Sequence, residues 1–87
     1  MTEPDDSDTN VPLAVDQVLD VSDLRCPMPL LKTKLALNQL GVGARLLVVA
    51  TDAGSARDIP AFLKLTRHKL ISFDDVDDSF RFLIERG

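Results

Sequence analysis

The chain has 87 residues, of which 45% are hydrophobic and 28% charged, a composition typical of one globular domain and not of a disordered chain. Its single cysteine excludes an internal disulfide framework and favours a reducing compartment, so we expect a cytoplasmic protein. The acidic amino terminus lacks the features of a secretory signal, and no apolar run approaches the roughly 18 residues of a membrane span, so we expect no membrane location.

The net charge of −4 is unevenly spread along the chain. Residues 1–23 carry seven acidic side chains and no basic one, whereas residues 24–73 carry eight basic side chains and two acidic ones. The basic segment is either a solvated helical surface or a docking face for an acidic protein or an RNA. Phenylalanine is the only aromatic type and shows no pattern for stacking bases, so we expect no strong direct binding of nucleic acid.

The first predicted elements are a leader and a strand. Residues 1–15 are acidic, which predicts a disordered leader, and residues 16–87 then form a single domain. The sequence QVLDVS at 17–22 is short and rich in β-branched and aliphatic residues, which favours a strand.

A helix is predicted to start at the two prolines of Cys-Pro-Met-Pro, because proline is tolerated in the first helical turn. It should end near Leu40, just before Gly41 and Gly43. Its apolar side chains form two rows, which predicts a broad buried face: Met28, Leu31 and Leu35 in one row, and Leu30, Leu37 and Leu40 in the other.

A second strand and helix follow. RLLVVAT at 45–51 is a continuous apolar run that suits a central strand, and 52–55 has the composition of a turn. Asp58 is predicted to cap the second helix, with Pro60 in the first turn. The apolar residues of this helix have helical spacing: Ile59, Phe62, Leu63 and Thr66.

The last residues predict a β-hairpin. KLISF at 69–73 and SFRFLIE at 79–85 flank the acidic sequence 74–78, which we expect at a solvated tip. The element order is therefore βαβαββ, and right-handed crossovers place both helices on one face of a four-stranded mixed sheet. The expected fold class is an α/β two-layer sandwich.

Cys26 lies where the first helix is expected to begin. A helix amino terminus lowers the pKa of a thiol through its dipole and free N–H groups, and Arg25 and Lys32 add positive charge nearby. Pro27 and Pro29 fix the local backbone and should hold the sulfur at a rigid tip. These residues predict an exposed, activated thiol, but an inert and partly buried cysteine is the commonest fate of a free one, and the residues alone leave both interpretations open.

Residues 18–87 resemble the TusA-like (SirA-like) sulfur carrier family. The most specific element is the Cys-Pro-x-Pro motif at 26–29, preceded by Leu19, Asp20 and Leu24. TDAGSARDIPAF at 51–62 resembles the second signature of the family, and FRFLIERG at the end of the chain resembles its closing strand.

The resemblance implies a sulfur relay in which Cys26 accepts sulfane sulfur from a cysteine desulfurase as a persulfide and passes it to an acceptor protein. In the best-known pathway of the family the sulfur ends in the 2-thiouridine of certain tRNAs, and other members serve sulfur oxidation or molybdenum cofactor supply. The expected protein is a relay that forms a covalent intermediate rather than a stand-alone enzyme, and it has no organic cofactor.

Three positions depart from the family pattern. Asp23 stands where glycine is frequent, and Asp can visit the left-handed region at modest cost. Met28 stands where an acid is frequent, which removes a negative charge beside Cys26 and favours the thiolate. Leu63 stands where some members carry another cysteine, so Cys26 can discharge only to another molecule.

Other polar residues have weaker claims to a role. Asp52, Arg57 and Asp58 lie in the second signature, where they either contact a partner or serve only as turn and cap residues. His68, the only histidine, is expected in a surface or helix-dipole role rather than in a pair with Cys26. We expect no metal site, because one Cys and one His cannot complete a structural zinc site.

Two function classes remain open. The first is the sulfur carrier, expected as a monomer that meets a desulfurase and an acceptor in turn. The alternative is a redox-sensing or regulatory adaptor that binds a protein partner through its basic helical face. Cys26→Ser distinguishes them: loss of activity with partner binding intact supports the carrier, and unchanged activity in a partner-dependent assay supports the adaptor. A stand-alone sulfurtransferase is a third and weaker hypothesis, because no segment resembles a donor-substrate pocket.

Overall fold

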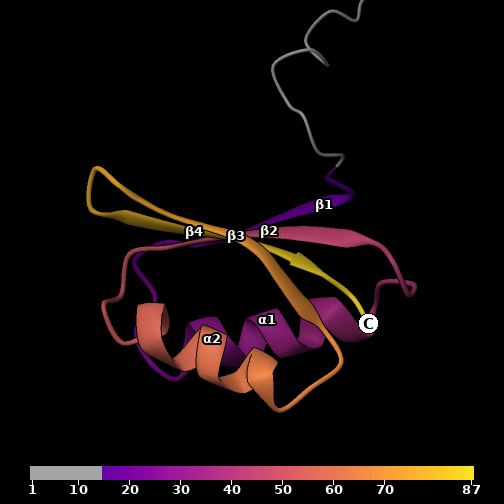
Figure 1. Cartoon of the computed structure of the whole chain (residues 1–87). Coiled ribbons are helices and arrows are strands. Elements are labelled where there is room, and N and C mark those ends of the chain that lie inside the picture. The colour runs from indigo at the N-terminus through magenta and orange to yellow at the C-terminus, as the bar shows by residue number, and fades with distance from the viewer. Residues whose placement is uncertain (1–14) are drawn as a thin grey trace, which may run out of the picture.

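Two helices cover one face of a four-stranded mixed sheet in the computed structural model (Figure 1). The structure describes residues 15–87, and the predicted leader at 1–15 lies outside the described residues except for its last position. The elements are β1 (Gln17–Val21), α1 (Met28–Asn38), β2 (Arg45–Ala50), α2 (Ser55–Lys64), β3 (Lys69–Val76) and β4 (Ser79–Glu85). The predicted βαβαββ order and the α/β two-layer sandwich are confirmed.

The sheet order is β1-β2-β4-β3, in which β1 and β2 are parallel and the other neighbours antiparallel. Each of the two parallel strands is followed by a helix. Because parallel neighbours point the same way, the loops that follow Val21 and Ala50 leave the sheet at the same edge. This topology brings the loop that carries Cys26 beside the loop at 51–54.

The core lies between the sheet and the two helices. Alternate residues of β2 point toward the helices, as the period of a strand requires, and its neighbour β4 adds side chains beside them on the same face. The buried residues of this core are Val21, Ala36, Leu37, Leu46, Val48, Ala50, Ile59, Leu63, Phe82 and Ile84. Leu83 is also buried, but it lies on the opposite face of β4 from Phe82 and Ile84. Neither helix in residues 15–87 is long and apolar enough to span a membrane.

The expected broad buried face of α1 is wrong. The row formed by Met28, Leu31 and Leu35 is 41%, 44% and 62% exposed, and the buried side chains are Pro29, Thr33, Ala36 and Leu37. The reason is the layer arrangement, because a helix in a two-layer sandwich packs one side against the sheet and leaves the other side without a covering layer. The outer side of α1 is therefore an exposed apolar row.

The second helix begins earlier than predicted. It starts at Ser55 with Gly54 as the N-cap residue, so Asp58 lies within the first turn and does not cap it, and Pro60 lies inside the helix. The capping side chain is Asp52, whose Oδ2 accepts a hydrogen bond from the Ser55 N–H at 3.2 Å. The spacing of apolar residues correctly predicts the buried side of this helix, with Ile59 and Leu63 buried.

The hairpin is tighter than predicted. Strand β3 continues through Asp74 and Asp75 to Val76, so only Asp77 and Asp78 form the turn. Their φ angles are 53° and 63°, and a two-residue turn with positive φ at both positions matches the right-handed twist of the strands. The acidic sequence is exposed as predicted, but most of it is strand.

Candidate functional site around Cys26

The exposed Cys26 lies one residue before the N-cap of α1, as the sequence predicts. The cap residue is Pro27, and Met28 is the first helical residue. Pro29 is buried in the core, and its carbonyl oxygen accepts a hydrogen bond from the Thr33 hydroxyl at 2.8 Å. This buried first turn anchors the motif while the sulfur stays at the surface.

The loop before Cys26 is held by the second signature. Asp23 has a φ of 70°, so it takes the left-handed conformation expected where the family often has glycine. Its backbone N–H donates a hydrogen bond to the Thr51 hydroxyl at 2.8 Å. Sequence analysis did not single out Thr51, because nothing local shows that this side chain accepts from a residue 28 positions earlier.

The most direct contact of the thiol is with Asp58. The Cys26 Sγ donates a hydrogen bond to Asp58 Oδ2 at 3.1 Å. The other carboxylate oxygen, Oδ1, lies 3.7 Å from Arg57 Nε. The hydrogen bond to Asp58 is the main cause of a raised pKa of Cys26; desolvation and the charges of Asp58 and Asp52 raise it further, and Arg57 opposes them. The expected lowering of the thiol pKa is therefore wrong.

Two backbone N–H groups at the start of α1 already have acceptors and are not free to stabilise a thiolate at Cys26. The Met28 N–H donates to the Arg25 carbonyl at 2.8 Å, and the Leu31 N–H donates to the Pro27 carbonyl at 3.0 Å. A thiolate at Cys26 would compete with these backbone acceptors for the same hydrogen atoms. In contrast, the carboxylate of Asp58 faces the sulfur directly and disfavours a second negative charge there.

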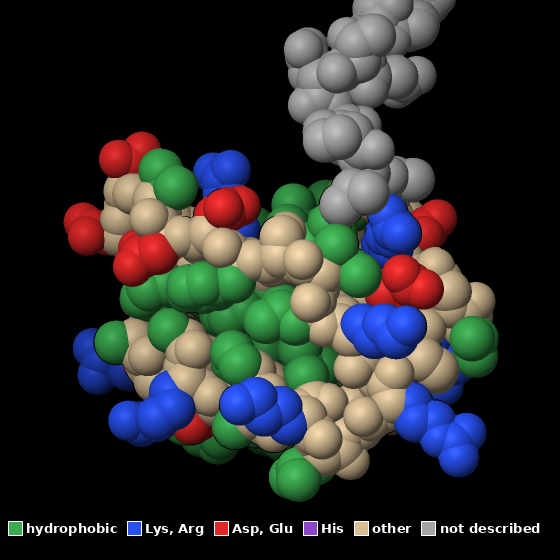
Figure 2. Space-filling model, in the orientation of Figure 1, with side chains coloured by type: hydrophobic (Ala, Val, Ile, Leu, Met, Phe, Trp, Pro, Cys, Tyr) green, Lys and Arg blue, Asp and Glu red, His purple; other side chains and the backbone are tan. Residues whose placement is uncertain are grey.

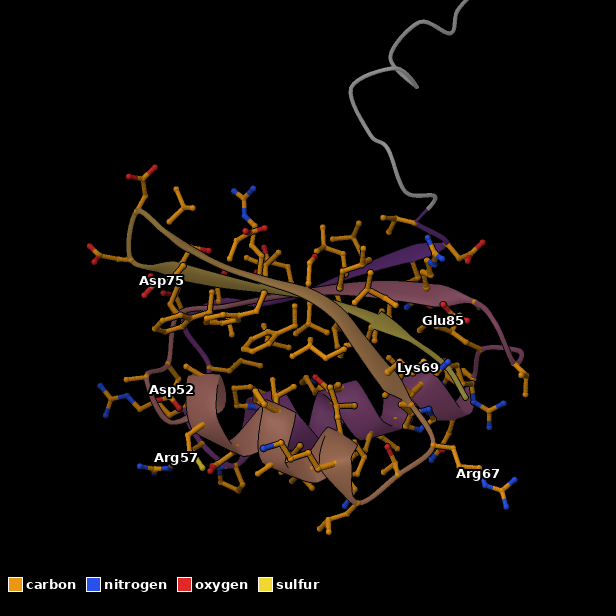
Figure 3. All side chains as sticks on the ribbon, viewed as in Figure 1. Asp52, Arg57, Arg67, Lys69, Asp75 and Glu85 are labelled. Carbon is orange, nitrogen blue, oxygen red and sulfur yellow. The ribbon has the colours of Figure 1, made fainter. Side chains whose placement is uncertain are left out.

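The predicted partner residues fall into two groups. Asp52 lies in the loop before α2, Arg57 and Asp58 lie in its first turn, and Figure 3 shows Asp52 and Arg57 at the same end of the molecule. Arg25 joins them by lining an open depression of about 280 Å³ with Asp23, Leu24, Thr51, Asp52 and Ala53. Lys32 does not join them, because it lines a separate depression between α1 and β1, with Gln17, Leu19, Leu35, Ala36 and Gln39.

Gly54 lies beside both the Asp52 carboxylate and Cys26. A β-carbon at this position would lie 3.6 Å from the Cys26 β-carbon and only 3.0 Å from Asp52 Oδ2. The second distance is tighter than an ordinary contact, so a side chain here would require the carboxylate that accepts from the Ser55 N–H to shift by a few tenths of an ångström. Gly54 is a second residue of the site that sequence analysis described only as part of a turn.

His68 is not part of this site. It follows the carboxyl end of α2, whose 10 residues span roughly 15 Å from the Cys26 end. Figure 3 shows its neighbours Arg67 and Lys69 at the end of the molecule opposite Asp52 and Arg57. The His68 Nδ1 accepts a hydrogen bond from the Gly87 N–H at 3.1 Å. Within residues 15–87, no three His, Cys, Asp or Glu side chains gather as a metal site requires.

Exposed apolar side chains of α1 lie beside Cys26, and basic side chains surround the helical layer as a whole. The exposed apolar row of α1 starts at Met28, two residues after the cysteine. In Figure 2 most of the Lys and Arg side chains in view surround the helical layer, whereas Asp side chains gather at the hairpin of β3 and β4. The thiol therefore lies next to an exposed apolar row, which suits contact with another protein.

The family model described as "Sulfurtransferase TusA" matches residues 17–86, which includes every strand and helix and the whole site around Cys26. The chain belongs to the TusA family. It is 44% identical over 72 residues to "Sulfur carrier protein TusA" of Allochromatium vinosum, an alignment that covers 83% of this chain and 95% of the relative. It is 43% identical over 72 residues to "Putative sulfur carrier protein YrkI" of Bacillus subtilis, with coverage of 83% and 96%. The family assignment made from the motif is confirmed.

Proposed function

We propose that this TusA-family protein carries sulfane sulfur as a persulfide on Cys26, receiving it from a cysteine desulfurase and passing it to an acceptor protein. The transfer of sulfur to tRNA 2-thiouridine is the end point that the family resemblance favours. A lone carrier thiol needs a reducing compartment, so we place the reaction in the cytoplasm. Pro27 and Pro29 support the site by anchoring the helix start, whereas Arg25, Asp52, Arg57 and Asp58 supply contacts for partners.

The observation that carries this proposal is the exposure of the only cysteine at the Cys-Pro-x-Pro motif of a sulfur carrier family. A persulfide adds one sulfur atom beyond Sγ, and an exposed thiol gives that atom room and gives a second protein access to it. The apolar row of Met28, Leu31 and Leu35 beside it offers a surface that a protein partner can bury. Lys32 lies on the β1 side of α1 and contributes at most to the edge of such an interface.

The test is the intact mass of the full chain after incubation with a cysteine desulfurase and cysteine without reductant. We expect a gain of one or more sulfur atoms that reductant removes and that Cys26→Ser lacks. No gain of mass in the wild type, with its Cys26 thiol free to react with an alkylating agent, would contradict the carrier role. That result would favour the adaptor, whose partner binding would be unchanged in Cys26→Ser.

A further inference from the structure

We propose that Asp58 is a positioning residue that holds Cys26 as a hydrogen-bonded thiol, and that reaction at the sulfur is favoured when the incoming molecule brings a cationic group to pair with Asp58. This inference deepens the proposed function, on which its link to sulfur transfer rests. According to this inference, Asp58 makes Cys26 react faster with molecules that carry a positive charge than with others. A residue that only capped α2, or a surface charge that made no contact with the thiol, would not produce this preference for cationic molecules.

The geometry divides the Asp58 carboxylate between two neighbours. Oδ2 accepts the thiol hydrogen bond at 3.1 Å, and Oδ1 lies 3.7 Å from the Arg57 guanidinium. The Asp58 side chain is 33% exposed and that of Arg57 84% exposed. Arg57 is therefore a loosely held cation on the solvent side of the carboxylate, and an arginine or lysine of a second protein can take the same position.

The surrounding charges give the sulfur a negative environment. Asp58 and Arg57 face it from the first turn of α2, and Asp52 acts on it from the loop after β2. Arg25, the nearest cation on the loop of Cys26 itself, lies in the depression beside Asp23 and Asp52. Two carboxylates and one exposed guanidinium therefore determine the charge at the thiol. A cation added to this group compensates the carboxylate that disfavours the thiolate.

The step that this arrangement controls is an exchange between a thiol and a persulfide. The Cys26 sulfur attacks the outer sulfur of the donor persulfide and forms a new S–S bond. The donor S–S bond breaks, its electron pair stays on the donor cysteine, and the proton lost by Cys26 ends there. One thiol and one persulfide yield another thiol and another persulfide with no net oxidation. Neutralising Asp58 favours this step because it lowers the free energy needed to form the Cys26 thiolate.

The experiment compares three methanethiosulfonate reagents on the full chain. They carry a trimethylammonium group, no charge or a sulfonate group, and each transfers its thioalkyl group to Cys26 with release of methanesulfinate. We expect Asp58→Asn to raise the rate with the neutral reagent roughly three- to tenfold at pH 7, because the carboxylate no longer suppresses the thiolate. We also expect the rate ratio of the cationic to the anionic reagent to fall roughly threefold or more.

Two matched variants make the result specific. Asp52→Asn removes the same charge but keeps the thiol hydrogen bond to Asp58, so its neutral-reagent rate should rise less than that of Asp58→Asn. Arg57→Gln removes the opposing cation and should lower that rate. Far-UV circular dichroism checks that each variant is folded. An unchanged or lower neutral rate in Asp58→Asn, or an equal rise in Asp52→Asn, would overturn the proposal.

A desulfurase loading assay separates this inference from the proposed function. For each protein, the rate of persulfide formation is divided by the rate of reaction with the uncharged methanethiosulfonate. This ratio should be higher in the wild type than in Asp58→Asn. Equal ratios would show that Asp58 does not select the protein donor and would refute its link to transfer. If the wild type gains no sulfur at all, the carrier role fails, whereas the reagent series still decides whether Asp58 controls the thiol.

Discussion

Phe82 is the residue whose truncation best tests how the hairpin packs against the helices. Its side chain is completely buried, its cross-strand partners are Val48 and Phe73, and its ring centroid lies 5.1 Å from that of Phe73. Replacing a buried Phe by Ala costs about 3–5 kcal/mol, because the transfer free energy of the ring is lost and a cavity remains. At about 0.05–0.15 kcal/mol per residue, the 73 described residues have a total stability of about 4–11 kcal/mol. Phe82→Ala therefore removes about a quarter of the stability or more.

Phe73 provides the matched comparison. It lies on the same side of the sheet, but β3 is an edge strand and leaves this side chain 41% exposed. The remaining burial predicts a cost of about 1–2 kcal/mol for Phe73→Ala. If Phe82→Ala does not fold, Phe82→Leu takes its place, with an expected cost of about 1–2 kcal/mol because most of the volume is kept.

The assay is urea unfolding followed by far-UV circular dichroism, since the chain has no Trp or Tyr for fluorescence. We expect a much lower midpoint for Phe82→Ala than for Phe73→Ala, with similar slopes. Equal losses in the two Ala variants would refute the reasoning, because they would mean that burial at these two positions is the same. A smaller loss of unfolding free energy for Phe82→Ala than for Phe73→Ala would mean that Phe73, and not Phe82, is the more deeply buried side chain.

Three further predictions concern the site and the far end of α2. Asp23→Gly should keep or raise the free energy of unfolding, whereas Asp23→Val should lower it by about 1–2 kcal/mol, because the φ of 70° suits glycine and excludes a β-branched residue. The pKa of His68 is held below its ordinary value of 6.5, first by burial and then by the charge of Arg86. The free energy of unfolding should therefore keep its full His68 contribution above pH 6.5 and decrease as the pH falls below 6.5, because the unfolded chain binds the proton more readily. His68→Gln should remove the share of this decrease that is due to His68. Met28→Glu should raise the pKa of Cys26, measured from the pH dependence of alkylation by iodoacetamide.

Each of these has a clear contrary outcome. Equal unfolding free energies for Asp23→Gly and Asp23→Val would show that the left-handed conformation has no cost. A pH profile of stability that is the same in wild type and His68→Gln would contradict the depressed pKa of the histidine. If the pH midpoint of alkylation in Met28→Glu equals that of the wild type or lies below it, the charge at this helix start does not raise the pKa of the thiol.

Much of the fold could be predicted because the signals are local. The apolar spacing of Ile59 and Leu63 identifies the buried side of α2. In β4, alternation places Phe82 and Ile84 on the core side, but Leu83 on the opposite side is also buried, so a single buried face describes this strand only in part. The errors arise where a distant residue intervenes. Helix α2 starts three residues before Asp58 because Asp52 caps it, and the outer row of α1 is exposed because no third layer covers it.

In the candidate site, too, some features follow from the local sequence and others depend on residues that are distant in the chain. The sequence by itself determined that Cys26 precedes a helix, that two prolines hold this helix start and that the motif is one of a sulfur carrier family. Only the tertiary structure decided the acidity of the thiol, because the carboxylate that binds it is 32 residues away in the chain. The parallel pairing of β1 with β2 places the two loops side by side, and electrostatic effects on a pKa depend on separation in space rather than along the chain.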